Sequence, residues 1–132
     1  MRAATLPERP MRYVIFNYVH PDDVALWEAW TPDEQAADVA RHQAWFGRWR
    51  EHVVGGEELD LPRTVKTLRP GRQGEGITVT DGPFVETKEL LGGFVIVEAA
   101  DMDEVLAMAR EWPSLASQAQ ATVQVQPVHV RE

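Results

Sequence analysis

Cysteine is absent from this sequence of 132 residues. Its absence excludes disulfides, thiolate nucleophiles and metal or iron–sulfur sites built on cysteine ligands, and it fits a reducing compartment. Residues 1–10 also lack an apolar run of the kind that forms the core of a signal peptide. We therefore expect a cytoplasmic protein.

Long hydrophobic runs and a surplus of basic charge are missing as well. No apolar stretch reaches the length needed to cross a bilayer, so we expect no membrane association. The 13 Lys and Arg residues are outnumbered by 21 Asp and Glu residues, which gives a formal net charge of −8. Because a phosphate backbone is bound by clustered basic side chains, we expect no direct contact with nucleic acid.

The basic residues that do lie close together form a short mixed segment. Arg41, Arg48 and Arg50 are its members. Asp38 precedes them and Glu51 follows, and such a mixture of charges is typical of a solvated helix face.

Motifs for nucleotide or metal binding are missing too. The spaced glycines of residues 71–76 belong to a predicted hairpin turn, with no helix behind them to direct amides at a phosphate. The histidines lie on different predicted elements and match no short ligand motif: they are His20, His42, His52 and His129. We predict no cofactor and no metal.

The length of the chain suits one domain. Residues 1–10 carry two prolines and little apolar pattern, which predicts a disordered or loosely docked extension ahead of a domain over residues 11–132. Residues 11–19 are β-branched and aromatic, as expected of a central strand. Further strands are predicted over residues 53–59, 64–69, 76–80, 93–99 and 121–130, with 64–69 and 76–80 joined as a hairpin.

Two helices are predicted from their capping signals. Thr31-Pro32-Asp33-Glu34 combines an N-cap, a proline at the first helical position and a capping-box glutamate. Asp101-Met102-Asp103-Glu104 repeats this logic. The stripes expected to face the core are Val39, His42, Phe46, Trp49 and Val53 for the first helix, and Val105, Met108, Ala109 and Trp112 for the second.

The order of these elements predicts an α+β fold. It is a ferredoxin-like βαββαβ unit with an added hairpin, in which an antiparallel sheet carries both helices on one face. Pro127 predicts an edge position for the last strand, because proline donates no ladder hydrogen bond. The other face of the sheet needs a cover, and the simplest cover is a second copy, so we expect a homodimer packed sheet to sheet.

The tetrapeptide Asp81-Gly82-Pro83-Phe84 is the most specific feature of the sequence, and its residue types predict a turn. Together with Leu90-Leu91-Gly92-Gly93, the pair Arg41-His42 and the turn Val54-Gly55-Gly56-Glu57, it resembles the signature of the YCII-related superfamily, in its DGPF branch. The resemblance covers about residues 11–130. It implies a ferredoxin-like dimer and, since some members are encoded beside or fused to extracytoplasmic-function sigma factors, an association with a sigma-factor pathway.

The same resemblance implies an active-site pair of a histidine in the first helix and an aspartate, and one relative removes chloride from a chlorinated hydroxyquinol. His42 is the residue that matches the histidine. The aspartate of YCII-type relatives lies in an Asp-Pro step after the second helix, where this sequence reads Trp112-Pro113. Any such pair would therefore have to recruit Asp81.

His42 is a candidate catalytic residue on its own chemistry as well. On an apolar stripe, loss of water would favour the uncharged ring, which can act as a general acid or base. Alternatively, His42 is a core imidazole bonded to a backbone carbonyl. Asp81 would orient His42 or bind a substrate hydroxyl, or it caps local backbone amides.

Three residues are candidates for substrate binding. Glu86 and Lys88 follow the turn and could line a polar pocket, with Lys88 meeting an anionic group, or they belong to a solvated charged run. Trp45 could stack on a planar ligand, or it packs in the core or at an interface.

Two functions follow from these candidates. The first is binding of a small organic molecule with proton transfer by His42, as in lyase or isomerase chemistry that needs no cofactor. The second is a non-catalytic ligand-sensing or regulatory module linked to sigma-factor transcription control. Fold analogy alone does not separate them.

Overall fold

The computed structural model describes residues 11–60, 64–82 and 89–131. The extension predicted over residues 1–10 lies outside the described residues, as do Glu86 and Lys88. Along the chain the elements are β1 (Met11–Val19), α1 (Pro21–Glu28), α2 (Pro32–Arg48), β2 (Val53–Glu58), β3 (Lys66–Pro70), β4 (Ile77–Asp81), β5 (Leu90–Ala99), α3 (Met102–Arg110), α4 (Ser114–Ser117) and β6 (Thr122–Pro127).

The main sheet has four strands in the order β2-β5-β1-β6, and every neighbouring pair is antiparallel. This is the sheet order of the ferredoxin-like unit, with β3 and β4 as the added hairpin, so the predicted α+β fold is confirmed. The predicted strand over residues 11–19 is β1, with a neighbour on each side. The strand that contains Pro127 lies at an edge, as its sequence indicates.

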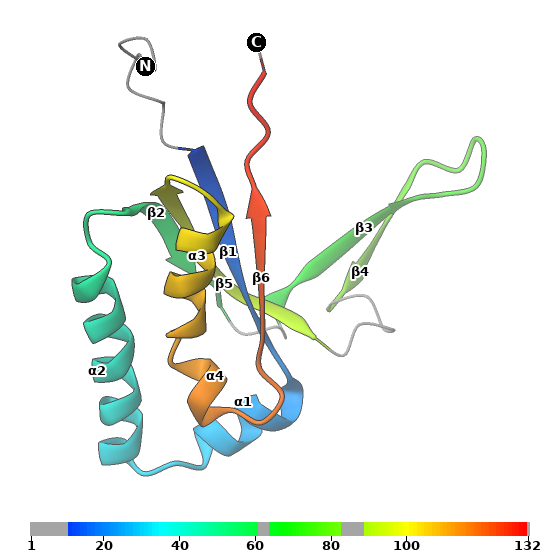
Figure 1. Cartoon of the computed structure of the whole chain (residues 1–132). Helices are drawn as coiled ribbons and strands as arrows, with labels where there is room; N and C mark the ends of the chain where they lie inside the picture. The colour runs from blue at the N-terminus through cyan, green and yellow to red at the C-terminus, as the bar shows by residue number, and fades with distance from the viewer. Residues whose placement is uncertain (1–10, 61–63, 83–88, 132) are drawn as a thin grey trace, which may run out of the picture.

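Helices α2 and α3 lie side by side on one face of this sheet (Figure 1). Alternate residues of β1 and β5 point at them, because successive side chains of a strand point to opposite faces. The resulting core contains Tyr13, Ile15, Val95, Val97, Trp45 and the predicted α3 stripe of Val105, Met108, Ala109 and Trp112. The stripe predicted for α3 is therefore confirmed.

Helix α2 begins where its capping signal predicts. The hydroxyl of Thr31 accepts from the Glu34 amide at 3.2 Å, and the Glu34 carboxylate accepts from the Thr31 amide at 3.1 Å. The stripe predicted for this helix is wrong in part: Val39 and Phe46 are 48% and 39% exposed. Both line an open cavity between α2 and the sheet, and Phe46 contacts Trp45 and Trp112 edge to face at its margin.

Helices α1 and α4 have no counterpart in the sequence analysis. His20 caps α1, its Nδ1 accepting from the Asp22 amide at 3.1 Å, and Pro21 occupies the first turn. Histidine is not among the preferred N-cap residues, so the segment gives no clear start signal. The buried carboxylate of Asp23 accepts from the Gln120 amide at 3.0 Å and joins α1 to the segment before β6.

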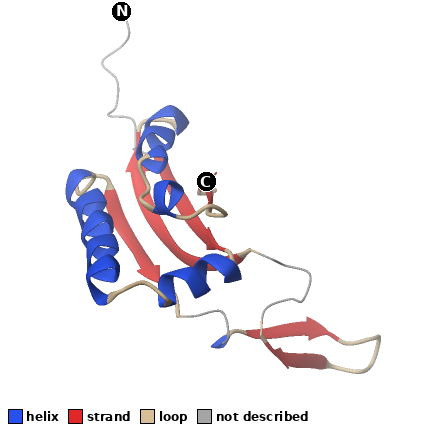
Figure 2. Cartoon of the chain, turned by 90° about the horizontal axis from the view of Figure 1, so that it is seen from below, coloured by secondary structure: helices blue, strands red, loops and turns tan. Residues whose placement is uncertain are grey.

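The predicted hairpin forms a separate two-stranded sheet, β3-β4, that projects from the body (Figure 1; Figure 2). Leu68 pairs with Val79, and Pro70 pairs with Ile77, so these side chains share one face. Leu68, Val79 and Ile77 are 63%, 61% and 64% exposed.

Glycines let β2 and β5 approach closely beside the cavity. Gly56 has φ 142°, and a methyl group there would lie 2.9 Å from the Val95 Cα and nearer still to the Phe94 carbonyl oxygen. A methyl group on the neighbouring Gly55 would lie 3.7 Å from the Ile96 side chain, which is ordinary contact.

We expect Gly56→Ala to lower the free energy of unfolding by at least about 2 kcal/mol, because it combines backbone strain with a clash against backbone atoms. Gly55→Ala, its matched control, should change that free energy by less than about 1 kcal/mol. Urea denaturation of both variants measures the difference. Equal losses in the two variants would contradict the described approach of β2 to β5.

The sheet face opposite the helices has an apolar centre that is only partly buried, beside Gln124 and Gln126 of β6. Val14 pairs with Ile96, and Phe16 pairs with Phe94 across β1 and β5. All four side chains are half-buried, and the four described helices contribute to the core or the cavity on the other face. An apolar sheet face of this kind needs a partner surface.

We predict that a second copy of the chain covers this face, since a two-fold interface places identical apolar patches against each other. Phe16→Glu should then yield a single-chain mass in light scattering after size exclusion, whereas the wild type gives the mass of two chains. Ala37→Glu, on the exposed side of α2, is the control and should stay dimeric. A wild type of single-chain mass would refute the homodimer.

Candidate functional site

A cavity of about 730 Å³ lies between α1, α2, α4 and the adjoining ends of β1, β2 and β5. Its walls are mostly apolar, and its floor includes the glycine pairs of β2 and β5. The uncharged polar side chains of its lining come from three elements: Asn17 from β1, Gln43 from α2, and Ser114 and Gln118 from the two ends of α4.

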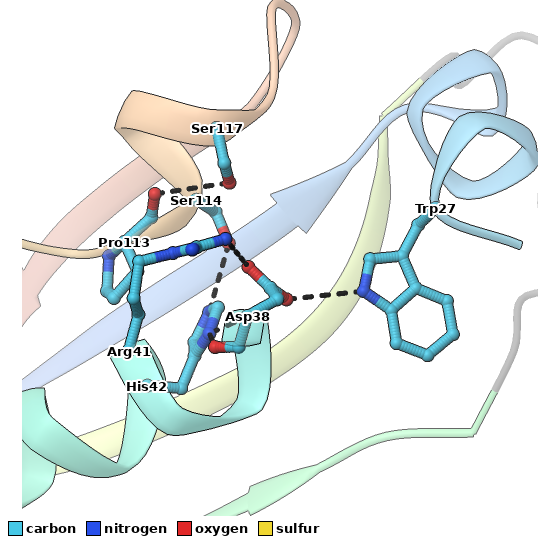
Figure 3. Close-up of polar contacts among 7 residues, drawn as sticks. All are labelled: Trp27, Asp38, Arg41, His42, Pro113, Ser114 and Ser117. Atoms are coloured by element: carbon cyan, nitrogen blue, oxygen red, sulfur yellow. Dashed lines mark hydrogen bonds and ion pairs between the residues drawn. The ribbon is translucent and has the colours of Figure 1, made fainter. Parts of the chain in front are cut away.

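His42 contributes the imidazole of this cavity. Its Nδ1 lies 2.8 Å from the backbone carbonyl oxygen of Asp38, and its Nε2 lies 3.2 Å from the hydroxyl oxygen of Ser114 (Figure 3). A carbonyl oxygen only accepts hydrogen bonds, so Nδ1 carries the hydrogen in the neutral ring and Nε2 is the acceptor. The side chain is 23% exposed, which leaves the ring accessible from the cavity.

Trp112 and Ser114 hold the ring of His42 from the side of α4. The Trp112 indole meets the imidazole edge to face at 5.1 Å between centroids. Ser114 is 2% exposed and directs its hydroxyl at Nε2. Residues 112–114 therefore bring an aromatic ring and a hydroxyl to the histidine.

Asp38 supplies the buried charge nearest to His42. It is 6% exposed, and its carboxylate accepts from Trp27 Nε1 at 3.2 Å and from an Arg41 guanidinium nitrogen at 3.3 Å. Its Oδ2 lies 3.7 Å from Nδ1 of His42 (Figure 3). The prediction that Asp38 belongs to a solvated helix face is wrong, because Trp27 of α1 covers it.

The i, i+4 spacing of Asp38 and His42 on one helix face is the signal that could have found this pair. Sequence alone does not show that α1 folds over the carboxylate. Gln35 fixes that arrangement, because its side-chain amide donates to the Trp27 carbonyl oxygen at 2.9 Å.

The structure does not bring Asp81 to His42 within one chain. Asp81 ends β4 in the projecting hairpin, where its 86% exposed carboxylate pairs with Lys66 across the two strands. It does not line the cavity. Strand pairing places Lys66 of β3 directly opposite Asp81, and the Asp81 carboxylate bonds this lysine. In the described contacts, the Asp81 carboxylate therefore does not orient the His42 imidazole and does not cap a backbone amide of the turn.

Trp45 lies in the core and not at the cavity. It is 3% exposed, and its Nε1 donates to the Met108 carbonyl oxygen at 2.9 Å. Its rings also pack edge to face against Trp112 at 4.9 Å. The two other candidates for substrate binding, Glu86 and Lys88, fall outside the described residues.

Within residues 11–60, 64–82 and 89–131, no three His, Asp or Glu side chains are grouped in a way that could hold a metal ion. In the same ranges, no helix is both long and apolar enough to span a bilayer.

Comparison with known proteins agrees with this architecture. Residues 11–129 match the family model of the YCII-related domain. The chain belongs to the YCII-related family. Its place in the DGPF branch stays a prediction.

A curated relative and a solved structure illustrate what this chain is similar to. An uncharacterised protein of Rhizobium meliloti (strain 1021) is 33% identical over 107 residues, which cover 76% of this chain and 79% of that protein. The 5-chloro-2-hydroxyhydroquinone dehydrochlorinase of Burkholderia phenoliruptrix AC1100, solved with 2,5-dihydroxybenzoquinone, aligns over 86% of this chain and 91% of its own. The TM-score is 0.47 at 19% identity, a likeness too distant to carry an argument about reaction or ligand.

The placement of Trp45 generates a prediction. Trp45→Phe keeps an apolar ring but removes the indole donor from the Met108 carbonyl oxygen, which retains only the Glu111 amide at 3.2 Å, and the smaller ring leaves a void beside Trp112. It should therefore lower the free energy of unfolding by about 1–3 kcal/mol. Phe46→Leu, at a neighbouring residue that lines the cavity, is the control and should cost less. Urea denaturation compares the two variants. A Trp45→Phe protein as stable as the wild type would contradict the core role of this indole.

Proposed function

We propose that this chain binds a small organic molecule in the cavity beside α2, and that His42 moves a proton of that molecule, as in lyase or isomerase chemistry. One observation carries the proposal. The Nδ1 contact to the Asp38 carbonyl oxygen leaves Nε2 of His42 without a hydrogen, beside the Ser114 hydroxyl, in a cavity large enough for a small ligand. A general base needs this combination of an unprotonated nitrogen and access to the substrate.

The neighbours of His42 support both halves of a proton transfer. When Nε2 takes a proton from the ligand, the ring becomes positively charged, and the Asp38 carboxylate at 3.7 Å stabilises that charge. The Ser114 hydroxyl can turn, so it donates to Nε2 in the neutral ring and accepts from it in the charged ring. The proton can then return to another atom of the ligand, which completes an isomerisation. In an elimination, the electron pair of the broken C–H bond instead forms a double bond and expels a leaving group, which departs with the proton of Nε2 or as an anion.

In this proposal Asp38 takes the part that the sequence analysis gave to Asp81. Asp38 lies one helical turn from His42 and is buried, whereas Asp81 pairs with Lys66 on the hairpin. The proposal also includes a cytoplasmic location, which the absence of cysteine supports.

The alternative is a non-catalytic module that senses a ligand and acts in a sigma-factor pathway. The same cavity would serve it, with His42 of α2 bonded to Ser114 of α4 through Nε2. The two proposals differ in what happens to the bound molecule: the enzyme exchanges one of its protons with solvent, and the sensor leaves it unchanged.

Deuterium exchange tests this difference. Metabolites that raise the melting temperature of the wild type in a thermal-shift screen are incubated with the protein in D₂O, and mass spectrometry measures deuterium incorporation at carbon. His42→Asn should slow incorporation at least about 100-fold, because general-base catalysis contributes that order of rate. Binding should change little.

His52→Asn is the matched control. His52 also bonds a backbone carbonyl through Nδ1, at 2.9 Å from Glu98, but it does not line the cavity. Exchange should continue in this variant. No deuterium incorporation into any stabilising ligand, or equal incorporation with His42→Asn, would remove the enzymatic proposal and leave ligand sensing.

A further inference from the structure

Glu58, at the end of β2, places a carboxylate on the cavity face of the sheet. Residues that pair directly across antiparallel strands project to the same face. Glu58 pairs with Gly93 of β5, which pairs in turn with Asn17 of β1. Asn17 stands two residues after Ile15, which lies in the core under the helices. The side chain of Glu58 therefore projects to the side of the sheet that carries α2, and Glu58 lines the cavity.

Glycines surround this carboxylate on the cavity face. Gly93 lies opposite Glu58, and Gly56 lies two residues before it, so neither neighbour has a side chain that could cover it. Neither position has room for a side chain either: a methyl group at Gly93 would lie 2.9 Å from the Glu57 carbonyl oxygen, and one at Gly56 would meet backbone atoms of β5. The close approach of β2 to β5 thus keeps the space next to Glu58 open.

The backbone at Glu58 is fixed, whereas its side chain is exposed. The next residue, Leu59, donates its amide to the Gly92 carbonyl oxygen at 2.9 Å and extends the pairing of β2 with β5 beyond Glu58. Within residues 11–60, 64–82 and 89–131, the Glu58 carboxylate has no hydrogen bond or ion pair. An ionised carboxylate only accepts hydrogen bonds. Glu58 therefore offers a ligand an accessible, negatively charged acceptor.

Glu58 and His42 belong to different walls of the cavity, because His42 enters it from α2 and Glu58 from β2. Asp38, the carboxylate beside His42, is already bonded to Trp27 and Arg41. The described lining contains no Lys or Arg that could pair with Glu58. A small molecule in this cavity of about 730 Å³, an ordinary size for a ligand site, thus meets a base on one wall and a carboxylate on another.

We infer that Glu58 binds an ammonium or hydroxyl group of a small molecule in this cavity, and that the cavity therefore prefers a cation to an anion of the same shape. An ammonium group forms a charge-assisted hydrogen bond with a carboxylate, a hydroxyl forms a weaker one, and an anionic group is repelled. The inference rests on the cavity of the proposed function, but it requires no reaction there.

Three probes with a common ring test this preference. Benzylamine is a cation, benzyl alcohol is neutral, and benzoate is an anion. Dissociation constants come from amide chemical shifts in protein NMR titrations up to about 10 mM, the range of weak fragment binding. Benzylamine should bind at least about tenfold more tightly than benzoate, with the alcohol in between. Equal or tighter binding of benzoate, or no binding of benzylamine, would overturn the inference.

Two neighbouring glutamates provide a matched pair of variants. Glu58→Gln and Glu57→Gln remove the same charge from the same strand. Glu57 also borders the cavity, but it pairs with Phe94, so its side chain projects to the opposite face of the sheet. Glu58→Gln should weaken binding of benzylamine at least about fivefold, and Glu57→Gln should change it less than about twofold. Equal weakening in both variants would indicate the general field of an acidic protein and would overturn the assignment to Glu58.

The deuterium-exchange experiment separates this inference from the proposed reaction. The preference for benzylamine should persist in His42→Asn, because recognition by Glu58 needs no base. If that preference persists while no ligand exchanges deuterium, the recognition stands and the proposed reaction fails. If exchange depends on His42 while Glu58→Gln leaves benzylamine binding unchanged, the reaction stands and the inference is overturned.

Discussion

The cavity wall is organised by the burial of one aspartate. A carboxylate out of water is unfavourable unless donors surround it, and Asp38 obtains them from Trp27 of α1 and from Arg41. The backbone carbonyl of the same residue accepts from Nδ1 of His42. One residue thus joins α1 to α2 and sets the state of the imidazole, so the position of α1 and the chemistry of the ring depend on each other.

The fold could be predicted wherever its signals are local. The capping box at Thr31 and the N-cap at Asp101 act within one helical turn, and both helices begin there. The β-branched and aromatic composition of residues 11–19 likewise marks a central strand. Helix α1 escaped prediction because His20 is an unusual cap. The buried stripe predicted for α2 is wrong in part because the periodicity argument assumes a filled core, whereas Val39 lines a cavity.

The site could be predicted only in part. His42 followed from its apolar neighbours and from the family resemblance, and the two alternatives weighed for it describe the same ring: Nδ1 bonds a backbone carbonyl while Nε2 remains a base. Asp38 was missed because a carboxylate in a mixed charged segment indicates a solvated helix face. The sequence does not show that Trp27, on another helix, covers it. Asp81 was chosen for its place in a signature, but strand pairing directs it to Lys66. Asn17 offered a signal in β1, a polar residue in an apolar alternation.

The tautomer of His42 tests the central claim most directly. Long-range ¹H–¹⁵N correlation spectra of the ligand-free protein distinguish a ring nitrogen that carries hydrogen from one that does not. The account predicts that the neutral imidazole carries its hydrogen on Nδ1, with Nε2 as the unprotonated base. A neutral ring with its hydrogen on Nε2 would contradict the contact to the Asp38 carbonyl and, with it, the proposed base.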